Sequence, residues 1–209
     1  MNTASGALQP CVYLVDDEAA VRDALVFLLQ SRNLAVQSFA SAAELLQNLA
    51  PADRLRGCFL LDVRMDPVSG LALHGELLVR GVRNPVLLMT GHGDIPMAVE
   101  ALKKGAFDFL EKPYSDNTLV DRLEQALAVD AAMHNHQARG AELRARLASL
   151  TEREQEVMQR VALGRLNKVI ADELGIAVRT VEVHRARVFS KLGVRSAPEV
   201  ATLLAHGTQ

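Results

Sequence analysis

The stretch CVYLVDDE at residues 11–18 decides the fold, because five apolar residues run directly into three acidic ones. A short apolar run of this kind is typical of a strand that is buried on both faces of a parallel sheet. Segments with helical patterning separate it from four more runs: AVQSF (35–39), CFLL (58–61), PVLLM (85–89) and FDFL (107–110). Five strand–helix units in succession predict an α/β domain with a five-stranded, doubly wound parallel sheet of the flavodoxin-like type.

Polar residues gather where the predicted strands end. Asp16 and Asp17 follow the first strand, Asp62 closes the third, Thr90 closes the fourth, and Lys112 follows the fifth. The carboxyl ends of parallel strands meet at one edge of a sheet, so these side chains are expected to share a pocket. Crowded carboxylates repel one another unless a cation lies among them, and oxygen-only ligation suits Mg²⁺. An aspartate beside a divalent metal and a lysine is equipped to accept a phosphoryl group.

The charge of the chain is divided between its two halves. Residues 1–130 contain 11 Lys or Arg and 17 Asp or Glu, a net charge of −6, whereas residues 131–209 contain 12 and 8, a net charge of +4. An acidic first part and a basic second part predict different partners for the two. We expect a first domain over residues 10–130, a linker helix over 131–149 with a break at Gly140, and a second domain over 150–207.

The second domain is expected to be entirely helical. Thr151 and Glu154 form a capping-box pattern that predicts the start of a helix over 151–163. Two further helices are predicted over 167–174 and 178–192, joined by a short turn that contains Gly175. Two short helices with such a turn between them indicate a helix-turn-helix, and the basic third helix suits the major groove of DNA.

Four motifs of the first domain resemble those of the receiver domains of two-component response regulators. They are VDDE (15–18), LLDVRM (60–65), MTGHGD (89–94) and FLEKP (109–113). The resemblance implies that Asp62 is the phosphoacceptor and that Mg²⁺ is bound by Asp17, Asp62 and the backbone carbonyl of Arg64, with Asp16 acting through water. It also implies a switch that responds to phosphorylation, made of Thr90, Lys112, Phe109 and the cis proline Pro113. The switch is expected to change a dimerisation surface that includes Val99 and Lys103.

One position departs from the receiver pattern. The family usually has proline four residues after the phosphoacceptor, whereas this chain has Asp66 there and Pro67 next. The length of the loop is kept, because Gly70 still lies eight residues beyond Asp62. The additional carboxylate bears on the rate of phosphorylation or the lifetime of the phosphoryl group, and not on the chemistry.

The stretch from Leu150 to Val194 resembles the DNA-binding domain of the LuxR/NarL class, and is most similar to the FixJ type. The resemblance implies phosphate contacts by one set of side chains and base contacts by another. The first set is Lys168, Thr180, His184, Arg187 and Lys191, and the second is Arg179, Glu182, Val183 and Arg185. Ala177 stands where many members have a Ser or Thr cap before the third helix, and a missing cap costs about 1 kcal/mol.

Together these features predict a transcription factor that is switched by phosphorylation, not an enzyme beyond slow autophosphorylation from small donors and autodephosphorylation. The expected partners are a sensor histidine kinase, double-stranded promoter DNA, RNA polymerase and, once phosphorylated, a second copy of the chain. Two alternatives are a constitutive DNA-binding protein with an inert receiver and an Asp-nucleophile phosphohydrolase. The second alternative requires a general acid–base two residues beyond Asp62, where this chain has Arg64.

Location and the remaining reactive side chains give further expectations. No apolar run approaches the roughly 20 residues of a membrane span, and the N-terminus does not resemble a signal peptide, so a cytoplasmic protein is expected. Cys11 and Cys58 are expected to be buried free thiols, or a redox pair if their strands are neighbours. Four further histidines are expected on the solvated surface: His74, His92, His134 and His136. The pair His134 and His136 could alternatively bind a metal.

Overall fold

The computed structural model describes residues 9–91 and 95–207, so His92 and the end of the MTGHGD motif lie outside the described residues. The chain divides into two compact units, Met1–His134 and Asn135–Gln209. Each unit has its own buried apolar residues, on the two faces of the sheet in the first unit and between the helices in the second.

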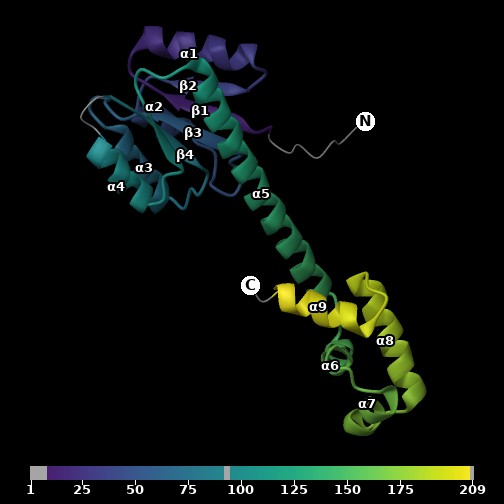
Figure 1. Cartoon of the computed structure of the whole chain (residues 1–209). Coiled ribbons are helices and arrows are strands. Elements are labelled where there is room, and N and C mark those ends of the chain that lie inside the picture. The colour runs from purple at the N-terminus through teal and green to yellow at the C-terminus, as the bar shows by residue number, and fades with distance from the viewer. Residues whose placement is uncertain (1–8, 92–94, 208–209) are drawn as a thin grey trace. The chain divides into compact units, whose positions relative to one another are not determined.

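The first unit is built on a five-stranded, wholly parallel sheet (Figure 1). Its strands are β1 (Cys11–Val15), β2 (Val36–Phe39), β3 (Gly57–Asp62), β4 (Val86–Thr90) and β5 (Asp108–Glu111), in the spatial order β2-β1-β3-β4-β5. The predicted strands are therefore confirmed, with ends that shift by about one residue. Every residue of β1, β3 and β4 is buried, as expected of strands covered on both faces.

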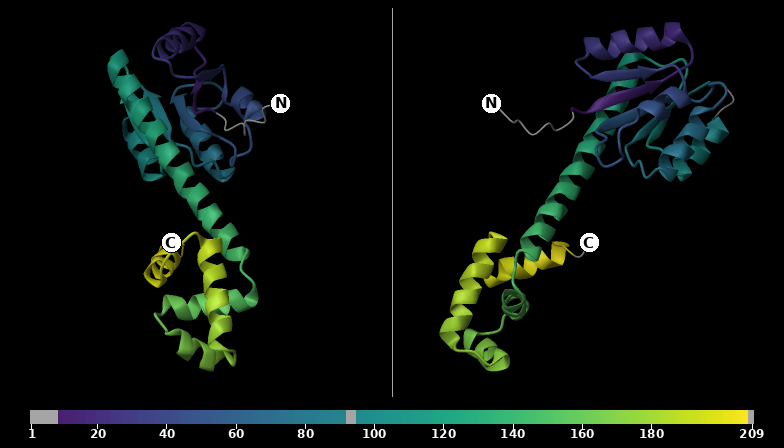
Figure 2. Two further views of the ribbon diagram at one scale, coloured as in Figure 1. Left: turned by 90° about the vertical axis from the view of Figure 1, so that its right-hand side faces the viewer. Right: turned by 180° about the vertical axis from the view of Figure 1, so that it is seen from behind.

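Helices cover both faces of this sheet, as Figure 2 shows from two sides. One face packs against α1 (Ala19–Ser31) and the first part of α5 (Asp116–Ala148), through residues such as Leu29 and Leu123. The other face packs against α2 (Ala42–Asn48), α3 (Gly70–Val79) and α4 (Ile95–Lys103), through residues such as Leu45 and Leu73. Alternate strand residues therefore belong to different cores, which is why the runs are apolar without interruption.

Helix α5 corrects one expectation from the sequence. Its 33 residues run from Asp116 to Ala148 without interruption, so the break predicted at Gly140 is absent. A glycine inside a helix lowers helix stability by about 1 kcal/mol relative to alanine. The favourable helix propensities of the neighbouring residues offset this loss in α5.

The second unit contains α6 (Glu152–Ala162), α7 (Asn167–Leu174), α8 (Val178–Leu192) and α9 (Ala197–Gly207) after the end of α5. The capping box of Thr151 and Glu154 is present at the start of α6. Helix α7 ends at Gly175, whose φ of 63° is left-handed, and α8 begins three residues later. The predicted helix-turn-helix is thus confirmed, and α9 adds a fourth helix whose Val200 is buried in the same core.

Several expectations about individual side chains can be compared with this fold. Cys11 and Cys58 are buried and free, although they lie on the neighbouring strands β1 and β3. His74 is only 2% exposed, so its prediction as a surface residue was wrong; helix α3 turns it toward the protein interior. No helix in the part of the chain that the structure describes is long and apolar enough to cross a membrane.

Candidate functional site

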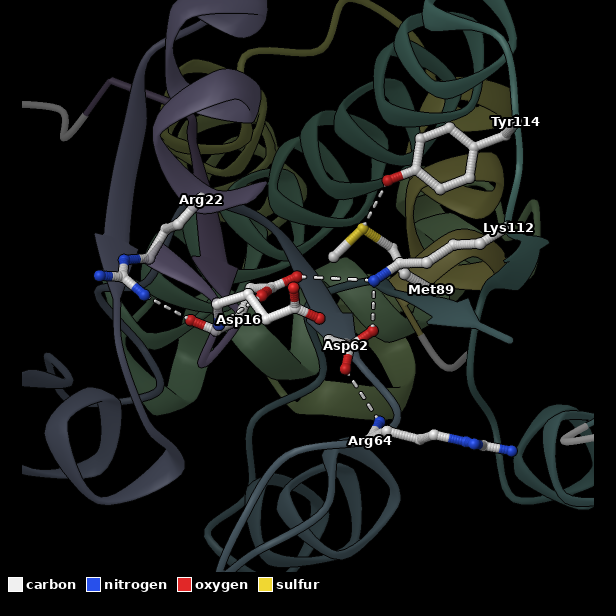
Figure 3. Close-up of polar contacts among 8 residues, drawn as sticks. Asp16, Arg22, Asp62, Arg64, Met89, Lys112 and Tyr114 are labelled. Carbon is white, nitrogen blue, oxygen red and sulfur yellow. Dashed lines mark hydrogen bonds and ion pairs between the residues drawn. The ribbon is translucent and has the colours of Figure 1, made fainter. Parts of the chain in front are cut away.

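Asp62 and Lys112 form the centre of a polar site at the carboxyl ends of the strands (Figure 3). Asp62 is the last residue of β3 and is 7% exposed. Its Oδ1 accepts a hydrogen bond of 2.7 Å from Nζ of Lys112, and its Oδ2 accepts one of 3.0 Å from the backbone N–H of Arg64. Both oxygens of this carboxylate are therefore held in a fixed orientation at the mouth of the site.

Asp16 lies beside this pair at the end of β1 and is 1% exposed. Its Oδ1 accepts a hydrogen bond of 2.9 Å from the backbone N–H of Glu18, whereas its Oδ2 has no hydrogen-bond partner among the described residues. Nζ of Lys112 is 3.7 Å from that Oδ2, close enough to attract it but too far for a hydrogen bond. Burial raises the pKa of Asp16, and the nearby charge of Asp62 adds to the rise. The ionised form of Asp16 is therefore disfavoured, and a further positive charge in the site would stabilise it.

Lys112 is shared between the two aspartates. Burial alone would lower the pKa of Lys112, but the hydrogen bond with Asp62 and the charges of Asp62 and Asp16 raise that pKa overall. A lysine with a raised pKa remains an ammonium group at neutral pH, and it is able to pair with the oxygens of an incoming anion.

The other predicted switch residues lie around this centre. Thr90 is fully buried at the end of β4, and its hydroxyl donates to the backbone carbonyl of Gly91 at 3.3 Å. The N–H of Lys112 donates to the carbonyl of Thr90 at 2.8 Å, which ties the two predicted anion-binding residues together through the backbone. Phe109 is partly buried in β5 against the core on the α3 side, and the Lys112–Pro113 peptide bond is cis.

The remaining predicted metal ligands are less closely gathered. Asp17 is exposed, and its Oδ2 accepts a long hydrogen bond of 3.4 Å from the backbone N–H of Asp66. Within residues 9–91 and 95–207, no group of three His, Cys, Asp or Glu side chains is placed to hold a metal by itself. A metal here would need backbone carbonyl and water ligands as well as carboxylates, which is how Mg²⁺ is usually bound.

Three supporting contacts were not predicted from the sequence. A Cβ on Gly70 would collide with the backbone carbonyl of Asp62, so only glycine lets α3 begin this close to the end of β3. Arg22 of α1 donates to the backbone carbonyl of Asp16 at 2.8 Å, and the hydroxyl of Tyr114 lies 3.0 Å from the sulfur of Met89. Only Gly70 carried a sequence signal, its spacing from Asp62; the other two contacts depend on the folded structure.

Val99 and Lys103, the predicted dimerisation residues, both lie exposed on α4. They are one helical turn apart and so share a face of that helix.

Helix α8 presents one basic face and one buried face. Val181, Val188 and Leu192 are buried in the core of the second unit. The predicted DNA contacts on the exposed face are Arg179, Thr180, Glu182, Val183 and Arg187, and exposed Lys168 lies on α7. The excess of positive charge in the helix-turn-helix therefore comes from α8, whereas α7 carries Lys168 together with Asp172 and Glu173.

Three predicted DNA contacts differ from these: Arg185 and Lys191 form contacts within the unit, and His184 is partly buried. Arg185 donates to the side chain of Asn167 at 2.9 Å and lies 5.2 Å from the centre of the Phe189 ring. Lys191 donates to Glu154 at 2.6 Å and to the carbonyl of Ser149 at 2.9 Å. Nδ1 of His184 is buried without a hydrogen-bond partner in the described part of the chain. Arg185 and Lys191 therefore brace α8 against its neighbours.

The fold and the two sites define a class of protein: a doubly wound α/β domain with an Asp–Lys pocket, followed by a helix-turn-helix domain. Comparison with known families agrees with this class in both parts. Residues 12–124 match the response regulator receiver domain, and residues 148–204 match the bacterial regulatory proteins of the luxR family.

Similar proteins extend over nearly the whole chain. The transcriptional regulatory protein FixJ of Azorhizobium caulinodans is 45% identical over 92% of this chain and 90% of its own length. The C4-dicarboxylate transport transcriptional regulatory protein DctR of Rhodobacter capsulatus is 48% identical over 92% and 98%. The solved structure of the response regulator StyR is 40% identical, with a TM-score of 0.87 over 95% of this chain and 99% of that one. The chain belongs to the two-component response regulators that carry a luxR-type DNA-binding domain, and it is a DNA-binding transcriptional regulator.

Proposed function

We propose that a sensor histidine kinase transfers a phosphoryl group to Asp62, and that this modification switches promoter binding. The observation that carries the proposal is the position of Asp62, which ends β3 with Oδ1 at 2.7 Å from Lys112 and with Asp16 beside it. An oriented carboxylate next to a cation is the arrangement that phosphoryl transfer requires.

In the proposed reaction, an oxygen of Asp62 attacks the phosphorus of a phosphohistidine. The new O–P bond forms as the P–N bond breaks, and the histidine leaves with the bonding electron pair. Lys112 turns from the carboxylate toward the phosphoryl oxygens, because they carry more negative charge than the aspartate did. A bound Mg²⁺ would neutralise the same oxygens; Asp17, Asp62 and the Arg64 carbonyl would hold it, with Asp16 acting through water.

Buried Asp16 provides the support for a metal in this proposal. Its Oδ2 lacks a partner among the described residues, and its pKa is raised. A divalent cation would favour the charged form of Asp16, so the residues present fit Mg²⁺ in their chemistry.

The downstream change is proposed to run from the pocket to α4 and β5. Thr90 would move toward the phosphoryl group together with Lys112, since a backbone hydrogen bond links the two residues. Phe109 would then fill the space that Thr90 leaves, and the surface that carries Val99 and Lys103 would change.

Incubation with acetyl phosphate and Mg²⁺, followed by mass spectrometry, tests the phosphoacceptor. We expect one phosphoryl group on the wild-type protein and none on Asp62→Asn, while Asp53→Asn, a change in an exposed turn, should label normally. Undiminished labelling of Asp62→Asn would refute the assignment. Equal affinity for Mg²⁺ in the wild type and in Asp17→Asn, measured by calorimetry, would refute the proposed ligand set.

Gel-shift titrations at several salt concentrations test the DNA-binding surface. Arg187 is exposed on α8, so Arg187→Ala should weaken binding to all sequences and lower the salt slope by about one unit. Glu182→Ala should relax the base preference at one position with a smaller loss of affinity. An unchanged salt slope in Arg187→Ala would contradict its role as a phosphate contact. Equal DNA affinity with and without phosphorylation would favour a constitutive DNA-binding protein instead.

A further inference from the structure

A cavity of about 420 Å³ lies in the first unit at the amino end of β4, away from the acidic pocket at its carboxyl end. Its walls come from the second half of α3, the loop that leads into β4, and the residues that follow α4. Leu77, Val82 and Val86 give it an apolar lining. A volume of a few hundred Å³ with largely apolar walls is typical of sites that hold small molecules.

His74 belongs to the lining of this cavity, and one of its ring nitrogens is unsatisfied. The residue lines the cavity and is 2% exposed, and its Nε2 is buried without a hydrogen-bond partner among the described residues. A buried ring nitrogen without a partner is costly, so such atoms in folded proteins usually meet a ligand or a water molecule. Burial lowers the pKa of His74, and the charge of Lys104 lowers it further, so the ring is neutral near pH 7.

The charged groups around the cavity are both cations. Arg83 and Lys104 line it, and no carboxylate is among the lining side chains in the part of the chain that the structure describes. Arg83 is held in place, because its guanidinium donates to the carbonyls of Leu78 at 3.0 Å and Val82 at 3.3 Å. Two cations without an acidic neighbour in the lining attract an anion.

We propose that this cavity binds a small carboxylate with a compact apolar body. The carboxylate would pair with Lys104 and Arg83, and the apolar body would pack against Leu77 and Val82. After a small movement of the His74 ring, a polar atom of the ligand would meet its buried Nε2. The site is separate from the acidic pocket, and the proposal does not depend on phosphorylation of Asp62.

A residue in the wall of the cavity is hydrogen-bonded to helix α5. Asn84 lines the cavity, and its Nδ2 donates to Oδ1 of Asp130 at 2.8 Å and to the carbonyl of Gly57 at 3.1 Å. Binding should therefore shift the backbone amide signals of residues near Asp130 as well as those of the cavity walls.

Binding of 4-fluorobenzoate to the full-length protein, followed by ¹⁹F NMR and by ¹⁵N–¹H spectra, tests the proposal. We expect saturable binding with a Kd of about 1 mM and amide shifts that map to residues 74–86 and 104–105. The uncharged analogue 4-fluorobenzyl alcohol should bind about tenfold more weakly, because it cannot form the charge-assisted contacts.

Substitutions in and outside the cavity lining test whether the probe binds in this cavity. Lys104→Gln removes an exposed charge at the rim and should weaken binding about tenfold without affecting the fold. His74→Leu should also weaken binding, whereas Arg80→Gln, which removes an exposed cation at the C-cap of α3 outside the cavity lining, should leave it unchanged.

The following results would overturn the proposal: no saturation up to about 20 mM probe, equal binding of the benzyl alcohol, amide shifts confined to other parts of the chain, or unchanged affinity in Lys104→Gln. Displacement of the probe by inorganic phosphate as effectively as by benzoate would overturn the apolar half of the assignment.

Discussion

Glu154 and Asp16 are both buried carboxylates, but their surroundings move their pKa values in opposite directions. The hydrogen bond from Lys191 lowers the pKa of Glu154 most, and the backbone N–H of Thr151 lowers it further. Among the described residues, the carboxylate of Asp16 accepts one hydrogen bond, from the backbone N–H of Glu18, and Lys112 is 3.7 Å from its other oxygen, so burial dominates and the pKa of Asp16 rises. Oε2 of Glu154 thus accepts from two donors, whereas Oδ2 of Asp16 has no hydrogen-bond partner among the described residues.

The pairing of Glu154 predicts a pH-dependent stability for the second unit. Because its pKa in the folded state is lowered, its contribution is present above the ordinary Glu value and is lost as the pH falls through the lowered value. Glu154→Gln keeps the shape of the capping box but removes the charge, and it should destabilise the unit by about 1.5–3 kcal/mol at pH 7.

Differential scanning calorimetry between about pH 3 and pH 7 would measure this effect on the unfolding transition of the second unit. The stability difference between the wild type and Glu154→Gln should shrink toward the acidic end. Glu152→Gln, an exposed change on the same helix, should stay within about 0.5 kcal/mol of the wild type. A constant difference at all pH values would show that the charge of Glu154 does not matter.

At this scale the sequence predicted residues at strand ends well and residues on helices less well. Asp62, Thr90 and Lys112 lie together as expected, because parallel strands end at one edge of the sheet. The burial of His74 and the pairing of Lys191 could not be predicted, because they depend on which side of a helix meets the core and on residues distant in the sequence.

Among the elements, α8 begins without a side-chain cap. Ala177 occupies the N-cap position with extended backbone angles, φ −69° and ψ 146°, which a capping serine also adopts. Ala177→Ser should therefore stabilise the second unit by about 0.5–2 kcal/mol.

Calorimetry would show this as a higher melting temperature of the second unit. Ala186→Ser places a serine at an exposed position in the middle of α8, where serine is a poorer helix former than alanine. This control should lower the melting temperature slightly. Equal effects of the two serines would rule out capping as the cause.

Helix α5 is attached to the base of the sheet by a buried carboxylate. Asp130 is 1% exposed; its Oδ2 accepts from the backbone N–H of Gly57 at 2.8 Å, and its Oδ1 accepts from Asn84 at 2.8 Å. Nδ1 of His134 lies 2.9 Å from the carbonyl of Asp130. This anchor lies beyond residue 124, where the match to the receiver family ends.

Removal of this carboxylate should destabilise the first unit. Asp130→Ala leaves the donors of Gly57 and Asn84 without this acceptor, and each costs about 1–3 kcal/mol, so a loss of about 2–6 kcal/mol is expected. Asp121→Ala, an exposed change on the same helix, should cost less than about 0.5 kcal/mol. Urea denaturation followed by far-ultraviolet circular dichroism compares the two, and similar midpoints would show that the anchor is dispensable.

The elements themselves were predicted with few errors, because uninterrupted apolar runs and a capping box are local signals. The break expected at Gly140 was wrong. Glycine lowers helix stability only at its own position, and the residues on both sides of Gly140 keep α5 helical. The anchor at Asp130 gave no sequence signal, since an aspartate late in an amphipathic helix is usually solvated.

For the whole molecule, the exposed face of α4 leads to a prediction about assembly. Phosphorylation with acetyl phosphate and Mg²⁺ should convert the 22.7 kDa chain to a species of twice that mass in light scattering. Val99→Asp and Lys103→Glu should keep the phosphorylated protein monomeric, because they alter the proposed dimer surface. Val79→Asp, at an 84% exposed position on α3, should still dimerise. Dimerisation of Val99→Asp and Lys103→Glu as strong as that of the wild type would place the interface elsewhere.

The anchor of α5 also bears on how such proteins evolve by exchange of parts. A recombination point between residue 84 and residue 130 would separate Asp130 from the asparagine and the glycine that it satisfies. A Cβ on Gly57 would collide with the backbone of Cys11, so that partner has little freedom to vary. Positions 84 and 130 should therefore change together across relatives, and a chimera that joins a foreign receiver to this α5 before residue 130 should recover stability when position 84 is restored to asparagine.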